Sequence, residues 1–91
     1  MKVIKQSTQF KKDLKRYKNQ PAKIEKLKTI LKYLMLGEKI PPEYNPHILS
    51  GKYKNHWECH IEDNFLIIWF DITNNTVKLV RLGTHHELFG K

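Results

Sequence analysis

The feature that most constrains the fold is an uninterrupted apolar run, FLIIWFDI, at residues 65–72. A strand with one face in water alternates apolar and polar side chains, so this run indicates a strand that is covered on both faces. The turn-forming segments EDN and TNN flank it. Beyond them lie two further strand-like stretches, residues 56–61 and 76–82. The sequence therefore predicts an antiparallel three-stranded meander with residues 65–72 in the middle.

The first half of the chain has helical periodicity after a short alternating stretch at residues 2–5. One helix is expected from a cap at Ser7 or Thr8 to about Tyr17, and a second begins at Pro21 and ends at Gly37. Their apolar positions recur every three or four residues and comprise Phe10, Leu14 and Tyr17, then Ile24, Leu27, Ile30, Leu31 and Leu34. This pattern predicts a helical hairpin with one apolar side and one lysine-covered side.

The segment between the hairpin and the meander, residues 38–55, contains three prolines at positions 41, 42 and 46. Proline excludes a regular helix or a central strand, so we expect a long loop, which is more often functional than a short one. The predicted architecture is a single α+β domain spanning residues 1–91. Its order is β-α-α-β-β-β, with an antiparallel sheet packed on the helical hairpin and a short helical turn at the C-terminus.

The charge is unevenly distributed along the chain. The formal net charge is +8, yet residues 1–39 carry twelve Lys and Arg against three acidic residues, and residues 40–91 carry five against six. All five histidines lie in the second part. A basic front half indicates a polyanionic partner such as RNA, DNA or an acidic protein, or else a solvated lysine-rich helix face.

Cysteine usage and hydropathy point to the cytoplasm. A single cysteine, Cys59, excludes an internal disulfide, which fits a reducing compartment. The sequence contains neither a signal-peptide-like stretch nor an apolar run of membrane-spanning length, so no membrane association is expected. The pairs Cys59–His60 and His85–His86 are adjacent residues that chelate poorly, and zinc-type spacings are missing, so no metal site is predicted.

Strand parity separates the residues of the first meander strand into two sets. Alternate side chains point to opposite faces, so Trp57, Cys59 and Ile61 should pack on the helices. Glu58, His60 and Glu62 should then lie together on the opposite face. This parity argues against Cys59 as a nucleophile, because it places the thiol in the core. A lone strand histidine is usually structural, so the other histidines decide whether His60 belongs to a site.

Several residues suited to acid–base chemistry accompany His60. His47 precedes the first meander strand, and Arg81 ends the last one, where Gly83 allows the chain to turn into the His85–His86 pair. Cleavage of RNA by its own 2′-hydroxyl requires a base, an acid and a cation for the phosphorane. Histidine can be acid or base near neutral pH, and arginine matches phosphate oxygens.

The sequence resembles the YafQ-like branch of the RelE/ParE toxin superfamily over nearly its whole length. The resemblance is strongest in HILSGKYK at residues 47–54, ECHI at 58–61 and RLGTHHELFG at 81–90. It implies a metal-independent and cofactor-independent endoribonuclease that cleaves mRNA at the ribosomal A site. It also implies an acidic cognate antitoxin as a partner, in addition to mRNA and the ribosome with its rRNA.

The resemblance also assigns roles to individual residues. It implies catalytic functions for His47, His60, Arg81 and His85, with His85 as the first choice for the general acid. His86 falls at a variable position of the motif and is interpreted as incidental. The residues expected to contact the RNA substrate are Lys52, Lys54, Asp63 and Phe89, with the Phe89 ring stacking on a base.

Two departures from the family pattern concern the site. Members often carry an aspartate in the turn after the strand histidine, where this chain has Asp63–Asn64, so the carboxylate is displaced by one position or lost. Members also often carry an arginine where this chain has Trp57. A positive charge near the RNA is then missing, or the tryptophan packs where the arginine stem would lie.

Two alternative functions stay open on the sequence. One is a non-nuclease toxin of the same fold that poisons gyrase, although such toxins generally lack the histidine set. The other is a catalytically idle module that binds RNA or protein, which the departures at Trp57 and Asn64 permit.

Overall fold

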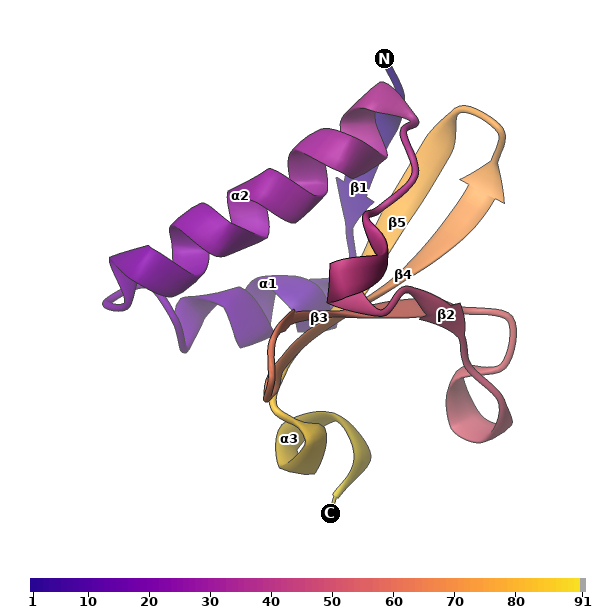
Figure 1. Ribbon diagram of the computed structural model, residues 1–91. Helices are drawn as coiled ribbons and strands as arrows, with labels where there is room; N and C mark the ends of the chain where they lie inside the picture. Colours follow the sequence, from indigo (N-terminus) through magenta and orange to yellow (C-terminus); the bar gives the residue numbers. More distant parts are fainter. Residues whose placement is uncertain (91) are drawn as a thin grey trace.

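The predicted meander forms the centre of a larger, five-stranded sheet in the computed structural model, which describes residues 1–90 (Figure 1). The strand order is β1-β5-β4-β3-β2. The strands are β1 (Val3–Gln6), β2 (His47–Ile48), β3 (Trp57–Glu62), β4 (Phe65–Thr73) and β5 (Thr76–Gly83). The helices are α1 (Thr8–Lys15), α2 (Pro21–Leu36) and α3 (His85–Phe89), with 3₁₀ turns η1 (Pro42–Tyr44) and η2 (Gly51–Tyr53). The α+β class and the helical hairpin are confirmed.

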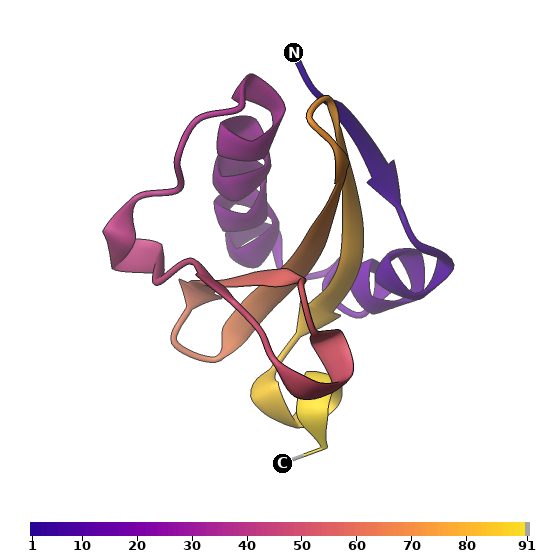
Figure 2. The ribbon, with the colours of Figure 1, turned by 90° about the vertical axis from the view of Figure 1, so that its right-hand side faces the viewer.

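The apolar strand β4 is covered on both faces, as its sequence predicts. Phe65, Ile67 and Trp69 join the main core with the apolar residues of α1 and α2. Leu66 and Ile68 point the other way, into a small cluster built mainly by η2 and α3. Figure 2 shows α2 along one side of the sheet, with η2 and α3 close together at its lower end. The two apolar clusters therefore pack on opposite faces of β4.

The N-terminal strand closes one edge of the sheet. β1 pairs in parallel with β5, with Ile4 opposite Val77, whereas the other neighbouring strands pair antiparallel. Ser7 then caps α1, because its side chain accepts a hydrogen bond from the backbone N–H of Phe10. At the far end of the hairpin, Gly37 adopts the left-handed conformation that terminates α2, as predicted.

The segment 38–55 is more ordered than the predicted loop. It contains the two-residue strand β2, in which His47 pairs with Glu58 and Ile48 with Trp57, between the turns η1 and η2. Proline at position 46 is compatible with this arrangement because β2 is the outermost strand and lies just after it. Two residues are too few to produce an alternating pattern, so the sequence did not predict this strand.

One parity prediction is wrong. Trp57, Cys59 and Ile61 pack against the helical core as expected, but Glu62 does not remain on the His60 face. A register shift between His60 and Glu62 interrupts the pairing of β3 with β4. A bulge of this kind re-aims the side chains that follow it. The Glu62 carboxylate instead forms ion pairs with Lys23 and Lys26 of α2.

None of the helices within residues 1–90 is long and apolar enough to cross a membrane.

Candidate active site

The sheet register brings residues from four strands into one row. His47 pairs with Glu58, Glu58 with Ile68, and Ile68 with Arg81. Directly paired residues have side chains on the same face of a sheet, and His60 lies on that face as well, two residues beyond Glu58. These residues therefore lie on the sheet face directed away from α2.

Three imidazoles come together on this face. The ring centroids of His47 and His60 are 6.2 Å apart, and those of His60 and His85 are 5.6 Å apart. Phe89 lies next to His85 with a centroid separation of 6.4 Å. His85 and Phe89 are four residues apart on α3, so they lie on the same side of that helix. Residues from β2, β3 and α3 thus form one surface, which we call the imidazole surface and define as His47, His60, His85 and Phe89.

His47 is placed so that both of its ring nitrogens face acceptors. Its Nδ1 lies 2.7 Å from the carbonyl oxygen of Asn45, which can only accept, so Nδ1 carries a proton. Its Nε2 lies 3.1 Å from Oε1 of Glu58. This arrangement suits either an imidazolium–carboxylate pair or a single proton held between the two side chains.

Glu58 is the residue of the site that the sequence did not identify as functional. Its side chain is only 5% exposed, and within residues 1–90 its Oε2 has no hydrogen-bond partner. The Nε2 atom of His60 lies 3.9 Å from the other oxygen, Oε1. A buried carboxylate oxygen is costly to leave unpaired, so the contact with His47 Nε2 is the one that compensates for the burial of Glu58. The alternation that placed Glu58 and His60 on one face was the signal that could have identified it.

The proton arrangement of His85 follows from its contact with Asn64. The backbone N–H of His85 donates to Oδ1 of Asn64 at 3.0 Å, which fixes that atom as the amide oxygen. The Nδ1 atom of His85 lies 2.9 Å from the same oxygen, so Nδ1 also carries a proton. In a neutral ring Nε2 is then the unprotonated nitrogen. Because His85 is exposed, Nε2 is the ring atom left to exchange protons with a substrate.

Arg81 is largely engaged by the protein itself. Its Nε donates to Oδ2 of Asp13 at 2.8 Å and its Nη2 to Oδ1 at 3.3 Å, while Nη1 donates to the Tyr53 hydroxyl at 3.2 Å. The side chain is 15% exposed. The other N–H of Nη2 donates to the Glu87 carbonyl oxygen at 3.4 Å. Among residues 1–90, only the second N–H of Nη1 then has no acceptor. The guanidinium is therefore held mainly by the scaffold, and one of its N–H groups stays available to a ligand.

Asp13 is fully buried and holds this end of β5 in place. Beyond its contacts with Arg81, it accepts a hydrogen bond from the backbone N–H of Leu82 at 2.9 Å and another from Gln9 at 3.1 Å. Burial alone would raise the pKa of Asp13, but the hydrogen bonds from Arg81, Leu82 and Gln9 outweigh it and keep the pKa below its usual value. The carboxylate therefore stays ionised at neutral pH.

The residues expected to contact RNA occupy different environments. The Phe89 ring packs edge-on against Tyr53 with a centroid separation of 6.0 Å, and Lys52 lies over the Tyr53 ring at 5.4 Å. Lys54 is exposed beside them. Asp63 is exposed in the β3–β4 turn, and within residues 1–90 its side chain has no hydrogen bond or ion pair, so Asn64 is the turn residue that contacts His85.

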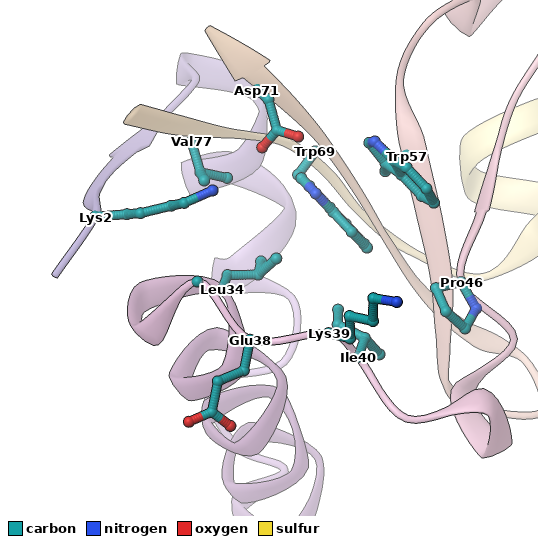
Figure 3. A pocket seen from close by; sticks show the side chains of 11 residues that line it. Lys2, Leu34, Glu38, Lys39, Ile40, Pro46, Trp57, Trp69, Asp71 and Val77 are labelled. Carbon is teal, nitrogen blue, oxygen red and sulfur yellow. The ribbon is translucent and has the colours of Figure 1, made fainter. Parts of the chain in front are cut away.

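Trp57 lies on the other side of the sheet, in a hollow beside the end of α2 (Figure 3). Its ring stacks on that of Trp69, with centroids 6.1 Å apart and planes within 11°. Leu34, Ile40 and Val77 also line this hollow. The tryptophan therefore packs against the helical core, and it does not replace a positive charge on the imidazole surface. Across residues 1–90, no group of three or more His, Cys, Asp or Glu residues is arranged to hold a metal ion.

Comparisons with known proteins agree with this architecture. Residues 2–90 match the family described as "Bacterial toxin of type II toxin-antitoxin system, YafQ". The "mRNA interferase toxin YafQ" of Escherichia coli K12 is 31% identical over 88 residues, covering 96% of this chain and 95% of that protein. The crystal structure of YafQ from E. coli BL21(DE3) superposes with a TM-score of 0.88 at 28% identity, covering 99% of this chain and 100% of that one. YafQ in the E. coli DinJ–YafQ complex gives a TM-score of 0.86 at 30% identity with the same coverage.

Replacing Asp13 by alanine should lower the free energy of unfolding by about 3–5 kcal/mol, because it leaves the Arg81 guanidinium without its buried partner. Urea denaturation at pH 7 measures this change. Glu25→Ala is the matched control, since the Glu25–Lys28 pair is exposed and is expected to contribute less than about 1 kcal/mol. Equal losses in the two variants would contradict the assignment.

The stability difference between the wild type and Asp13→Ala should depend on pH in acid. A carboxylate whose folded pKa is depressed contributes its full stabilisation above its unfolded pKa, here 3.8. The difference should therefore be constant above about pH 4 and shrink as the pH falls further towards the folded pKa.

The ring protons of His85 provide a second prediction. At a pH where the ring is neutral, ¹⁵N NMR should show His85 with its proton on Nδ1, because the Asn64 oxygen accepts it there. Asn64→Ala removes that acceptor and should shift His85 towards the other tautomer. His56 serves as an internal control, because its Nδ1 faces the Lys54 carbonyl oxygen, which the substitution leaves in place. A wild-type His85 protonated on Nε2 would refute the assignment.

Proposed function

Because the chain belongs to the YafQ family of toxins from bacterial type II toxin–antitoxin systems, we propose that it is an mRNA interferase, an endoribonuclease that cuts messenger RNA. The observation that carries the proposal is the convergence of His47, His60 and His85 on one face of the sheet. General acid–base cleavage of RNA requires one group that donates a proton and one that accepts it, and imidazole is the side chain chemically suited to both roles.

The proposed reaction is an attack by the substrate's own 2′-hydroxyl on the adjacent phosphorus. The bond from the 2′-oxygen to phosphorus forms and the bond from phosphorus to the 5′-oxygen breaks, which leaves a 2′,3′-cyclic phosphate and a free 5′-hydroxyl. His85 donates a proton from Nε2 to the departing 5′-oxygen. The base that removes the 2′-hydroxyl proton comes from the group formed by His47, Glu58 and His60, in which the buried carboxylate accommodates the added proton.

The charge that develops on the phosphorane requires nearby cations. Arg81 offers the remaining N–H of Nη1, and the exposed Lys52 lies next to the Tyr53 ring that receives the Arg81 contact. Lys54 follows on the same turn. Phe89 borders the imidazole surface and supplies an aromatic face for the nucleotide beside the cleaved bond. The proposed substrate-binding group is thus Lys52, Lys54 and Phe89, with Asp63 at its border.

The basic helical hairpin indicates where the substrate is presented. Most of the excess positive charge lies in residues 1–39, on elements that do not carry the imidazoles. A nuclease that recognises only free mRNA has little use for a second basic surface, whereas ribosome-bound mRNA is surrounded by rRNA phosphates. We therefore propose cleavage in the ribosomal A site, with the hairpin bound to rRNA through contacts that weaken at high salt.

The same hairpin offers a groove for an antitoxin. Lys11, Lys15 and Lys18 line a hollow together with the apolar side chains of Leu14 and Ile24. RNA phosphates need only the cations, whereas an acidic polypeptide segment with an apolar side chain uses both the lysines and the apolar lining. We propose that the cognate antitoxin inserts such a segment here, in line with the complex that YafQ forms with DinJ.

Replacing His85 by alanine should reduce the rate of mRNA cleavage by about 10²–10⁴-fold, because it removes the general acid. The assay uses purified protein, translating ribosomes and a defined mRNA, with primer extension to map the cuts. His86→Ala is the matched control and should retain near-normal activity, because His86 is exposed and, among residues 1–90, no ring contact or side-chain hydrogen bond joins it to the imidazole surface. Equal cleavage by wild type and His85→Ala would remove His85 from the mechanism. Ribosome binding without any cleaved product from wild type would instead indicate an idle binding module.

Replacing Lys11, Lys15 and Lys18 together by glutamine should weaken antitoxin binding by at least tenfold, because the acidic segment loses its counter-charges. Isothermal titration with the antitoxin encoded beside this chain measures the affinity. The control replaces Lys28, Lys32 and Lys39 by glutamine, which changes the net charge equally on exposed residues outside the groove. Equal weakening by both triple variants would show that net charge alone, and not the groove, determines affinity.

A further inference from the structure

We propose that Tyr17 is a positioning residue for the active site, acting through Glu87 to fix the orientation of α3 and so of His85 and Phe89. Tyr17 lies in the turn after α1 and is far in sequence from the imidazole surface. The inference rests on the proposed function for its kinetic test, and it also has a structural test that is independent of activity.

The contact that carries the inference joins two elements from opposite ends of the chain. The Tyr17 hydroxyl donates to Oε1 of Glu87 at 2.5 Å, and Arg16 pairs with Oε2 of the same carboxylate at 3.4 Å. Tyr17 is 6% exposed, and its ring packs on Phe65 with centroids 4.7 Å apart. The hydroxyl is therefore held at the end of a side chain that the core fixes in place.

α3 needs such an external restraint because it is short. Its five residues are far fewer than the roughly 12–15 that an isolated helix requires. A capping box between Thr84 and Glu87 closes its first turn, and Leu88 anchors its base. Those contacts are local or apolar, and Arg81 adds a hydrogen bond to the Glu87 carbonyl oxygen at 3.4 Å. The hydrogen bond from Tyr17 is the directed contact that joins the Glu87 side chain to the turn after α1.

Helical geometry makes Glu87 the appropriate point of attachment. Successive residues are rotated by about 100° around the axis, so Glu87 lies roughly opposite both His85 and Phe89. Tethering Glu87 to the turn after α1 therefore directs His85 and Phe89 to the other side, where His60 lies. On that other side Asn64 holds His85 itself, so α3 is fixed between two hydrogen bonds.

The protonation states of the two side chains fix which of them donates in the Tyr17–Glu87 hydrogen bond. Burial, followed by the neighbouring Glu87 carboxylate, raises the pKa of Tyr17 well above its usual value. Burial favours protonation of Glu87, but hydrogen bonds from Tyr17 and Thr84 and the charge of Arg16 lower its pKa overall. Tyr17 is therefore the donor and Glu87 the acceptor across the neutral range.

The kinetic test compares Tyr17→Phe with wild type in the ribosomal cleavage assay. The substitution keeps the ring and removes only the hydroxyl, so we expect kcat to fall about 10-fold to 100-fold with KM little changed, as misorientation of a catalytic group predicts. Tyr33→Phe is the matched control, because within residues 1–90 the Tyr33 hydroxyl has no hydrogen-bond partner. An unchanged kcat in Tyr17→Phe overturns the proposal.

A double variant separates positioning from a general loss of stability. If Tyr17 acts through His85, adding Tyr17→Phe to His85→Ala should reduce kcat by far less than it does in the wild-type background. Reductions of equal size in both backgrounds would show that Tyr17 acts elsewhere, and would overturn the proposal.

The structural test needs no RNA cleavage. In ¹H–¹³C NMR spectra of Tyr17→Phe, the ring signals of His85 and Phe89 should shift and broaden, while those of His47 on β2 keep their positions. If wild type fails to cut mRNA, the proposed function fails while this measurement still decides the role of Tyr17. Unchanged His85 and Phe89 signals overturn the proposal.

Discussion

The buried ion pair between Asp13 and Arg81 is the interaction on which the site depends. It joins the first helix to the last long strand, two elements separated by almost the whole chain. Asp13 also accepts a hydrogen bond from the Leu82 N–H, which fixes the backbone as well as the side chains. Because Asp13 is fully buried and Arg81 is only 15% exposed, leaving the carboxylate without its partner would be strongly unfavourable. The pair therefore specifies how α1 sits on β5. That placement in turn positions Tyr53 on one side of Arg81 and α3 on the other. The Arg81 guanidinium is therefore shared by the scaffold and the proposed site.

The sheet divides the molecule into a side for stability and a side for chemistry. The face towards α2 holds the main apolar core, including the stacked Trp57 and Trp69. The opposite face carries the imidazole surface over a much smaller apolar cluster. β4 supplies the buried middle layer for both, which is why it is apolar throughout. A substitution on the helical face can thus alter stability without touching the proposed chemistry.

Proton placement distinguishes the histidines from one another. His47 faces an acceptor at each of its two nitrogens, the Asn45 carbonyl oxygen and the buried Glu58 carboxylate. His85 is held at Nδ1 by Asn64 and presents Nε2 to solvent. An aspartate at position 64 would add a charge beside His85, and the amide supplies the same acceptor geometry without that charge. Asn64 therefore orients the ring without placing a charge beside it.

The sequence by itself determined the meander, the helical hairpin and the face on which His60 lies, because these follow from local periodicity and from the turns between the strands. The family resemblance indicated His47, His85 and Phe89 before any of them could be placed. Only the tertiary structure decided the strand β2, the burial of Glu58, and the engagement of Arg81 by Asp13. Each of those features joins residues that lie far apart in the chain, or too few residues to form a pattern, and contacts of that kind leave no periodic signal in a single sequence.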